Sequence, residues 1–272
     1  MFVSFKNVFR KTIFARSYCQ RAAKNDRKTM GIIVIGDEIL KGEVQDTNSA
    51  FLAQELHKLG LKLQKISVIG DEINDVSQEV RLFSGKYDYV ITSGGIGCTH
   101  DDITFEAVAK AFNVPLYEHP ELRKLCFKFY KTENPDSPGL KLARVPSIAK
   151  LNWETSAGYQ INYPIISVNN IYIFPGIPQL LRKAFLASSK VLFRTDSQFF
   201  TKNIFCNATE DKIVDILNTV VQEYPQVQFG SYPKLNDSEY KVKLTIESSK
   251  EDLTEKAYQK LLDLLPKGFI VK

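Results

Sequence analysis

SGGIGCTHDDIT, residues 93–104, directly follows the short apolar run Tyr89–Thr92 and precedes a helical pattern. Glycine at positions 94, 95 and 97 permits positive φ angles and close backbone approach, so the N–H groups of this turn can converge on an anion. The helix that follows adds the positive end of its dipole. The spacing is not the dinucleotide-binding GxGxxG, and the turn lacks the lysine of a P-loop. We interpret the segment as an anion-binding turn, with a tight strand-to-helix connection as the alternative.

The residues around this turn alternate between buried strands and amphipathic helices. Ile32–Ile35 and Leu61–Ile69 are apolar runs of the kind found in strands that are covered on both faces. Apolar residues at helical spacing follow each run: Phe51, Leu52, Leu56 and Leu59; Ile73, Val76, Val80 and Phe83; Phe105, Val108, Ala109 and Phe112. Three consecutive strand–helix units predict an α/β domain over residues 30–195, built on a doubly wound, mostly parallel sheet.

The later part of this domain is less regular. Pro120 begins a further helix, and two or three short strands are expected to end at Ile171–Phe174. The turn Pro175-Gly176 then precedes a helix that runs through Phe185.

Residues 200–272 follow another order of elements. Strands are expected at Asn203–Cys206, Val227–Ser231, Val242–Ile246 and Phe269–Val271, and helices at Ile213–Val220 and Leu253–Leu264. This βαββαβ order predicts a small α+β domain of the ferredoxin-like kind.

The first 30 residues carry the basic excess of the chain. They hold eight lysines and arginines and one acid, so the remaining residues have 28 basic and 30 acidic side chains. Apolar residues recur there at helical spacing: Phe2, Phe5, Phe9 and Ile13. We predict a mitochondrial presequence over residues 1–29 and a location in the matrix. The alternatives are an unstructured basic tail, or an upstream extension of a cytoplasmic protein that begins at Met30.

Composition argues against several other classes of protein. A nearly neutral folded part gives little support for a nucleic-acid surface, so no nucleic-acid partner is expected. No apolar run is long enough to span a membrane, so no membrane partner is expected either. The four cysteines, Cys19, Cys98, Cys126 and Cys206, form no CxxC pair, which argues against a structural zinc site and a disulfide framework.

Polar residues cluster where the predicted strands end, which is where a parallel sheet binds its ligands. The clusters are Gly36, Asp37 and Glu38; Asp46 to Asn48; Gly70 and Asp71; and the quoted turn with Asp101 and Asp102. Carboxylates beside a phosphate repel it unless a divalent cation such as Mg²⁺, Mn²⁺ or Co²⁺ bridges the two. We predict that Asp71, Asp101 and Asp102 bind this cation, with helix capping as the alternative role.

Two basic residues later in the chain are also candidates for the site. Lys141 and Arg144 either reach the anion or lie on a solvated basic face.

Several of these motifs occur together in one known family. They are GDEIL (36–40), DTN (46–48), GDE (70–72), the quoted turn, HPEL (119–122) and FPGIP (174–178). Together they resemble the MoaB/Mog-type molybdopterin-binding domain, in the CinA-like version that begins eukaryotic FAD synthase. GSYP (230–233) and YKVKLTIES (240–248) are similar to the segment that follows this domain there. The resemblance covers residues 29–272.

The resemblance implies a set of site residues. Asp71 and Asp102 match acidic positions that serve adenylyl chemistry in Mog-type relatives, which implies a catalytic role. The implied ligand-binding positions are Gly36, Asp37, Glu38, Asp46, Asn48, Ser93, Gly94, Gly95, Gly97, Thr99, Pro175 and Gly176. Such modules commonly assemble as dimers or trimers, so a homo-oligomer is expected.

Two functions follow from the resemblance. The first is a divalent-metal-dependent hydrolase that splits FAD or a related dinucleotide pyrophosphate, giving FMN and AMP from FAD. The second is a non-catalytic module that binds a nucleotide, flavin or molybdopterin, and it is favoured by Cys98, where the CinA-like pattern usually has proline. The adenylyl transfer of FAD synthases belongs to a PAPS-reductase-like domain, which the sequence does not show, so this transfer is not expected from the chain alone.

Overall fold

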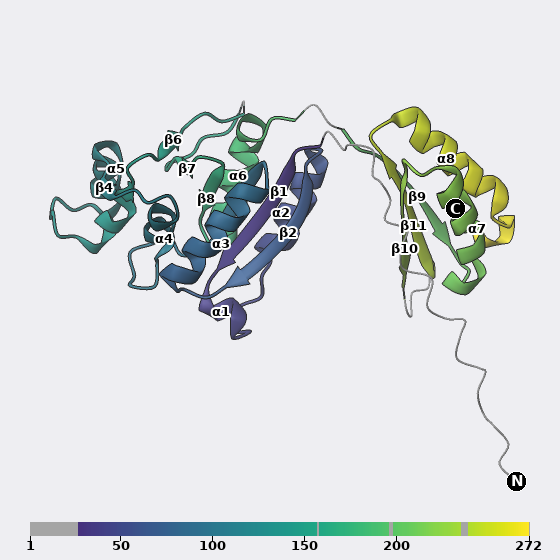
Figure 1. The fold of residues 1–272 in the computed structure, drawn as a ribbon, viewed down its shortest axis with the longest axis horizontal. Helices are drawn as coiled ribbons and strands as arrows, with labels where there is room; N and C mark the ends of the chain where they lie inside the picture. Colours follow the sequence, from purple (N-terminus) through teal and green to yellow (C-terminus); the bar gives the residue numbers. More distant parts are fainter. Residues whose placement is uncertain (1–26, 157, 196–197, 235–238, 272) are drawn as a thin grey trace, which may run out of the picture. The chain divides into compact units, whose positions relative to one another are not determined.

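A computed structural model describes residues 27–156, 158–195, 198–234 and 239–271 of the chain (Figure 1). The chain divides into two compact units. The larger unit contains Arg27–Thr201 with the short segment Ser249–Asp252, and the smaller contains Lys202–Ser248 and Leu253–Lys272. The predicted presequence lies almost wholly in residues 1–26, outside the described residues. No helix within the described ranges combines the length and the hydropathy that crossing a membrane requires.

The larger unit is built on a six-stranded sheet in the order β2-β1-β3-β8-β7-β6. The strands are β1 (Thr29–Ile35), β2 (Lys62–Ile69), β3 (Tyr89–Ser93), β6 (Lys150–Asn152), β7 (Ile165–Val168) and β8 (Ile171–Phe174). The first four in this order are mutually parallel, and β7 runs antiparallel to both β8 and β6. The predicted mostly parallel sheet is therefore confirmed.

Helices cover both faces of this sheet, as the buried side chains of β1 show. Met30, Ile32 and Val34 pack in one core with α2 (Asn48–Lys58) and α6 (Pro178–Leu192). Ile33 and Ile35 point to the opposite face, because successive side chains of a strand alternate. That face packs against α3 (Ile73–Lys86) and α4 (Thr104–Ala111). The sheet is thus doubly wound.

A peripheral group of short elements completes the larger unit (Figure 1). It contains β4 (Leu116–Glu118), α5 (Pro120–Tyr130), the 3-10 turn η1 (Pro138–Ala143) and β5 (Arg144–Pro146). Strands β4 and β5 pair antiparallel and bring the two ends of this segment together. The four-residue helix α1 (Asp37–Leu40) follows β1 and was not predicted, since one turn is too short to show helical periodicity.

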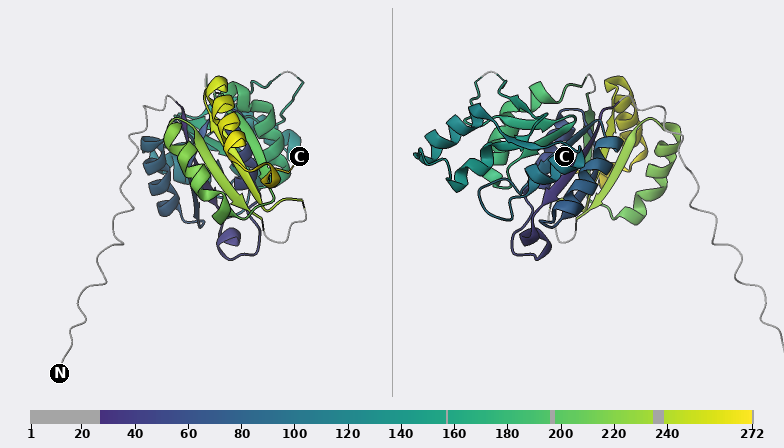
Figure 2. Two further views of the ribbon diagram at one scale, coloured as in Figure 1. Left: turned by 90° about the vertical axis from the view of Figure 1, so that its right-hand side faces the viewer. Right: turned by 60° about the vertical axis from the view of Figure 1, so that its left-hand side comes forward.

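The smaller unit places two helices on one face of an antiparallel sheet (Figure 2). Its elements are β9 (Phe200–Cys206), η2 (Glu210–Lys212), α7 (Val214–Glu223), β10 (Gln228–Pro233), β11 (Val242–Ser248), α8 (Glu251–Leu264) and η3 (Lys267–Phe269). The strand order is β10-β11-β9. The predicted last strand, Phe269–Val271, is reduced to one antiparallel bridge between Cys206 and Ile270. The reason is that Phe269, the first residue of the predicted strand, belongs to η3. Its N–H donates to the carbonyl of Pro266 at 2.8 Å.

We expect Asp88→Asn to destabilise the larger unit by ~1 kcal/mol at pH 7, allowing for solvent screening of a partly exposed group. The Asp88 carboxylate accepts hydrogen bonds from the N–H and hydroxyl of Thr29, at 2.7 and 2.8 Å, and from Lys28 at 3.1 Å. These contacts, with the N–H of Thr29 foremost, hold the pKa of Asp88 below its usual value. A depressed folded-state pKa contributes stability above the unfolded-state pKa, and this stability is lost as the pH falls through the folded-state value.

The difference between the wild type and Asp88→Asn should therefore shrink below about pH 4. Urea unfolding followed by the fluorescence of the single tryptophan, Trp153, reports on the larger unit. Equal stability of the two proteins at pH 7 would contradict the prediction.

Candidate functional site

Four turns meet at one edge of the larger sheet. Because β2, β1, β3 and β8 are parallel, the turns that follow Ile69, Ile35, Ser93 and Phe174 all leave from the same edge. The chain passes from β1 outward to β2 and then returns to β3 on the other side of β1. Such a reversal of strand order opens a crevice where α/β sheets bind ligands. We call the residues of these turns the site edge.

The glycine turn after β3 has positive φ angles at two of its three glycines, Gly94 and Gly95, but not at Gly97. Gly94 and Gly95 have φ angles of 105° and 62°, in the region that favours glycine. A Cβ atom on Gly94 would collide with the backbone carbonyl of Ile35 in the neighbouring strand. Thr104, at the start of α4, donates from its hydroxyl to the carbonyl of Gly94 and from its N–H to the carbonyl of Gly95, each at 2.9 Å.

These bonds satisfy the carbonyl groups of the turn and leave its N–H groups for a ligand. Within the described part of the chain, the N–H groups of Gly95, Ile96 and Gly97 donate to no protein acceptor. They lie just ahead of α4, whose N-terminal end attracts negative charge. Free N–H groups in such an arrangement are chemically suited to bind one phosphate or a similar anion.

Asp102 shapes the far end of the glycine turn. Its Oδ2 accepts hydrogen bonds from the N–H and the hydroxyl of Thr99, at 2.8 and 2.6 Å. Its carboxylate also fills the space that a Cβ atom on residue 97 would occupy, which fits the glycine at this position. Asp101 is more exposed, and a hydrogen bond from Thr99 lowers its pKa, with the nearby His100 and Lys141 adding to the effect.

Asn48 joins three of the turns. Its side chain is 7% exposed, and its Nδ2 donates to the hydroxyl of Ser93 at 3.1 Å and to the carbonyl of Gly176 at 2.7 Å. Its buried Oδ1 has no hydrogen-bond partner among the described residues. Gly176, which follows Pro175, lies so close to Gly94 that an added Cβ would be 3.1 Å from the Gly94 Cα. The start of α2, the glycine turn and the turn after β8 are thereby held together.

Two further aspartates face each other across the turns after β1 and β2. The N–H of Asp37 donates to Asp71 Oδ2 at 2.9 Å, and the N–H of Asp71 donates to Asp37 Oδ1 at 3.4 Å. Lys41 forms an ion pair with Asp37 at 3.1 Å. This lysine, and after it the N–H of Asp71, lowers the pKa of Asp37. Both carboxylates are therefore fixed by the backbone at this end of the site edge.

Asp46 and Glu38, which are predicted to bind the ligand, make local contacts in the structure, and their predicted role stays a prediction. Asp46 accepts a hydrogen bond from the N–H of Ser49 at 2.9 Å, so it caps the start of α2. Glu38 lies in α1, with its carboxylate folded back over Gly36. Neither contact points to a ligand.

The predicted cation ligands are not gathered into one cluster. Strand β1 separates β2, which precedes Asp71, from β3, which precedes the turn with Asp101 and Asp102. Neighbouring strands are ~4.8 Å apart, so these two strands are about 10 Å apart. No group of three or more His, Cys, Asp or Glu side chains among the described residues could hold a metal ion. The three aspartates therefore do not form a ready-made metal site by themselves.

Comparison with known proteins places the larger unit in a family. Residues 31–194 match the family described as probable molybdopterin binding domain. The chain belongs to this family. Residues 198–272 match the middle domain of FAD synthase, so a molybdopterin-binding-like domain is followed by an FAD-synthase-like one.

The relatives agree with this assignment. A protein of Caenorhabditis briggsae named "Probable FAD synthase" is 38% identical over 267 residues, covering 90% of this chain and 51% of the relative. This chain thus spans about half the length of that relative. A protein of Archaeoglobus fulgidus is 36% identical over 204 residues, covering 75% of this chain and 85% of the relative. The crystal structure of CinA from Thermoplasma acidophilum has a TM-score of 0.55 at 27% identity, covering 62% of this chain and 99% of that one.

One residue that holds the site edge together was not singled out from the sequence. Thr104 is fully buried and satisfies two carbonyl groups of the glycine turn. Its position at the first residue of the predicted helix was visible, but a threonine there usually indicates no more than a cap. Its hydrogen bonds to the carbonyl groups of Gly94 and Gly95 are visible only in the three-dimensional structure.

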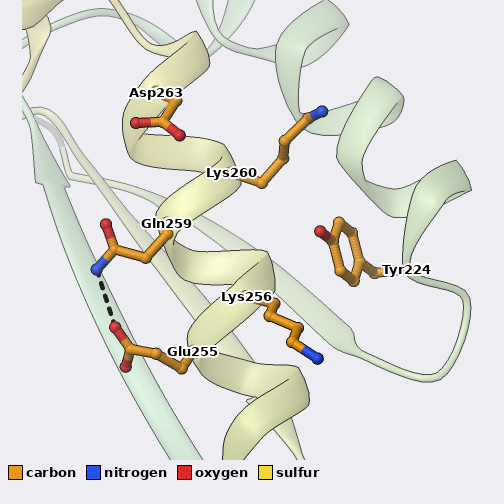
Figure 3. A pocket seen from close by; sticks show the side chains of 6 residues that line it. All are labelled: Tyr224, Glu255, Lys256, Gln259, Lys260 and Asp263. Atoms are coloured by element: carbon orange, nitrogen blue, oxygen red, sulfur yellow. Dashed lines mark hydrogen bonds between the residues drawn. The ribbon is translucent and has the colours of Figure 1, made fainter.

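The smaller unit offers a shallow groove between α7 and α8 (Figure 3). It is lined by Tyr224, Glu255, Lys256, Gln259, Lys260 and Asp263. Its charged groups are of both signs, and two of them form ion pairs, with Lys260 Nζ 3.2 Å from Glu223 Oε2 and Glu255 Oε2 2.9 Å from Lys202 Nζ. This is the pattern of a solvated helix face, so we do not assign the function to it.

We expect Gly94→Ala to destabilise the larger unit by at least ~2 kcal/mol, because its Cβ meets the carbonyl of a central strand at a φ that alanine disfavours. Gly85→Ala is a matched control, since a Cβ there meets nothing within 4 Å and Gly85 lies inside α3. This control should be neutral or stabilising by ~0.5–1 kcal/mol. Urea unfolding followed by Trp153 fluorescence compares the two, and similar stabilities would contradict the proposed strain.

We expect Asn48→Ala to cost ~1–3 kcal/mol, because it leaves the carbonyl of Gly176 and the hydroxyl of Ser93 without their donor. Ser93→Ala removes one acceptor and keeps the bond to Gly176, so it should cost about half as much or less. The same unfolding experiment measures both. If Ser93→Ala proved the more damaging, the amide of Asn48 would not be the residue that joins the turns.

Proposed function

We propose that this FAD-synthase-like protein binds the diphosphate of FAD or a related dinucleotide at the glycine turn and hydrolyses it in the presence of a divalent cation. The observation that carries the proposal is the set of N–H groups of Gly95, Ile96 and Gly97, which make no bond to the described protein and lie at the N-terminal end of α4. Carboxylates beside them supply the charge that a bridging cation requires.

The residues of the chain would have separate tasks in this reaction. The glycine turn would bind one phosphate, while Thr104 and Asn48 keep the turn in place from behind. The pKa values of Asp37 and Asp101 are lowered further from neutrality, so both carboxylates are ionised at neutral pH, as aspartates ordinarily are. An edge with this charge repels a bare diphosphate and accepts one that carries a cation.

The carboxylates fit a cation that arrives with the substrate. Magnesium at nucleotide sites commonly uses one or two protein carboxylates and completes its shell with phosphate oxygens and water, so a three-ligand protein cluster is not required. Either Asp102, beside the glycine turn, or Asp71, at the other end of the site edge, would hold it, and its contribution would be to neutralise the diphosphate and polarise its phosphorus–oxygen bonds.

The reaction consumes one water molecule. The water oxygen forms a bond to one phosphorus, and the bridging oxygen leaves with the other phosphate. FAD would give FMN and AMP, with the oxidation state of the flavin unchanged.

A non-catalytic binding module is the second candidate. It is favoured by the lack of a group of three metal-binding side chains in the described residues. In this alternative the glycine turn and Asn48 have the same tasks, but no bond in the ligand is broken.

The test is to incubate the full chain with FAD, ADP-ribose or NAD and with Mg²⁺, Mn²⁺ or Co²⁺, and to measure AMP by chromatography. We expect FMN and AMP in equal amounts from FAD, and a rate lower by about 100-fold in Asp102→Asn, the scale seen when one charged or polar transition-state contact is removed. The side-chain oxygen of asparagine can still accept hydrogen bonds from Thr99, so the turn should persist.

Asp263→Asn in the smaller unit is the control and should keep the wild-type rate. Tight binding without AMP would select the non-catalytic module, and no binding of any dinucleotide would overturn both candidates.

A further inference from the structure

Lys141 contacts the glycine turn from a distant part of the sequence. Its Nζ donates to the carbonyl of Thr99 at 2.6 Å, across 42 residues of chain. Thr99 is the residue whose N–H and hydroxyl are bound by Asp102. The far end of the turn is therefore held by two groups, a carboxylate on its own segment and an ammonium from η1.

The backbone on both sides of Lys141 is firmly anchored. Leu140 and Ala143 are 5% and 0% exposed, so the 3-10 turn that carries Lys141 is packed into the core. The hydroxyl of Tyr163 donates to the carbonyl of Leu142 at 2.6 Å. Burial raises the pKa of Tyr163, which keeps this hydroxyl protonated and able to donate. Lys141 thus extends from a rigid base, and holding its ammonium in place costs little further backbone entropy.

The ammonium has the capacity to bind a phosphate as well. It carries three donors, and the bond to Thr99 uses one of them. No carboxylate of the described residues lies within ion-pair distance of Lys141, although its charge helps to lower the pKa of Asp101. Lys41, at the other end of the site edge, is by contrast paired with Asp37.

We infer that Lys141 is a positioning residue of the anion site, which fixes the end of the glycine turn through Thr99 and donates to the diphosphate of the bound dinucleotide. The second part rests on the proposed function, whereas the first part concerns the ligand-free protein alone. Arg144, three residues along the chain, is exposed at the start of β5 and is not needed for this role.

The first experiment tests the contact with the turn in the full chain without ligand. Hydrogen exchange of residues 97–104 is compared in the wild type, Lys141→Met and Lys141→Arg. We expect exchange at Thr99 to be at least about threefold faster in Lys141→Met, because the turn loses one of its two restraints, and close to the wild type in Lys141→Arg. Lys150→Met, at the exposed first residue of β6, is the control and should not change exchange in the turn. Unchanged exchange in Lys141→Met would overturn the positioning role.

The second experiment tests the contact with the ligand by calorimetric titration with ADP-ribose and with pyrophosphate, each with Mg²⁺. We expect Lys141→Met to weaken both about tenfold, as for the loss of one charge-assisted hydrogen bond, and Lys141→Arg to bind within about threefold of the wild type. Equal affinities in the wild type and Lys141→Met would overturn the phosphate contact. If the wild type binds neither probe, the proposed function fails, and the exchange experiment still decides whether Lys141 holds the turn.

Discussion

The close approach of Gly94 to the carbonyl of Ile35 is the contact on which the site edge depends. It brings the turn after β3 against the end of β1, at the point where the strand order reverses. A side chain at position 94 would push these strands apart, so the approach requires glycine. Thr104 then satisfies the carbonyl groups of the turn from inside the fold, and the N–H groups of Gly95, Ile96 and Gly97 make no bond to the described protein. The proposed anion site rests on that division.

Charge is distributed unevenly along the edge. One end carries Asp37 and Asp71, linked through each other's N–H groups, and the other carries Asp101 and Asp102 beside the glycine amides. Because β1 separates the two ends, one small ion cannot rest on all of these groups, whereas an extended diphosphate with its cation could contact both ends. Lys141 offsets part of the negative charge at the glycine end. The positive charge of this lysine reduces the repulsion between the acidic edge and the proposed phosphate ligand.

The comparisons match the two parts of the chain to two different domains. The molybdopterin-binding-like domain contains the glycine turn and the carboxylates beside it, and its fold resembles that of the CinA structure. The FAD-synthase-like middle domain has a three-stranded sheet with a solvated helix face.

The sequence alone determined the local features of this protein. Apolar periodicity identified most of the strands and helices of both units, and the spacing of three glycines after a buried strand predicted the glycine turn, because these signals lie within a few residues of one another. Contacts between distant residues were decided only by the tertiary structure. Asn48 reaches Gly176 across 128 residues, and Lys141 reaches Thr99 across 42. The position of β1 between the two groups of aspartates also depends on strand order, which leaves no mark on local pattern. Sequence spacing therefore identified which residues carry charge and flexibility, while the order of strands in the sheet determined which of them meet.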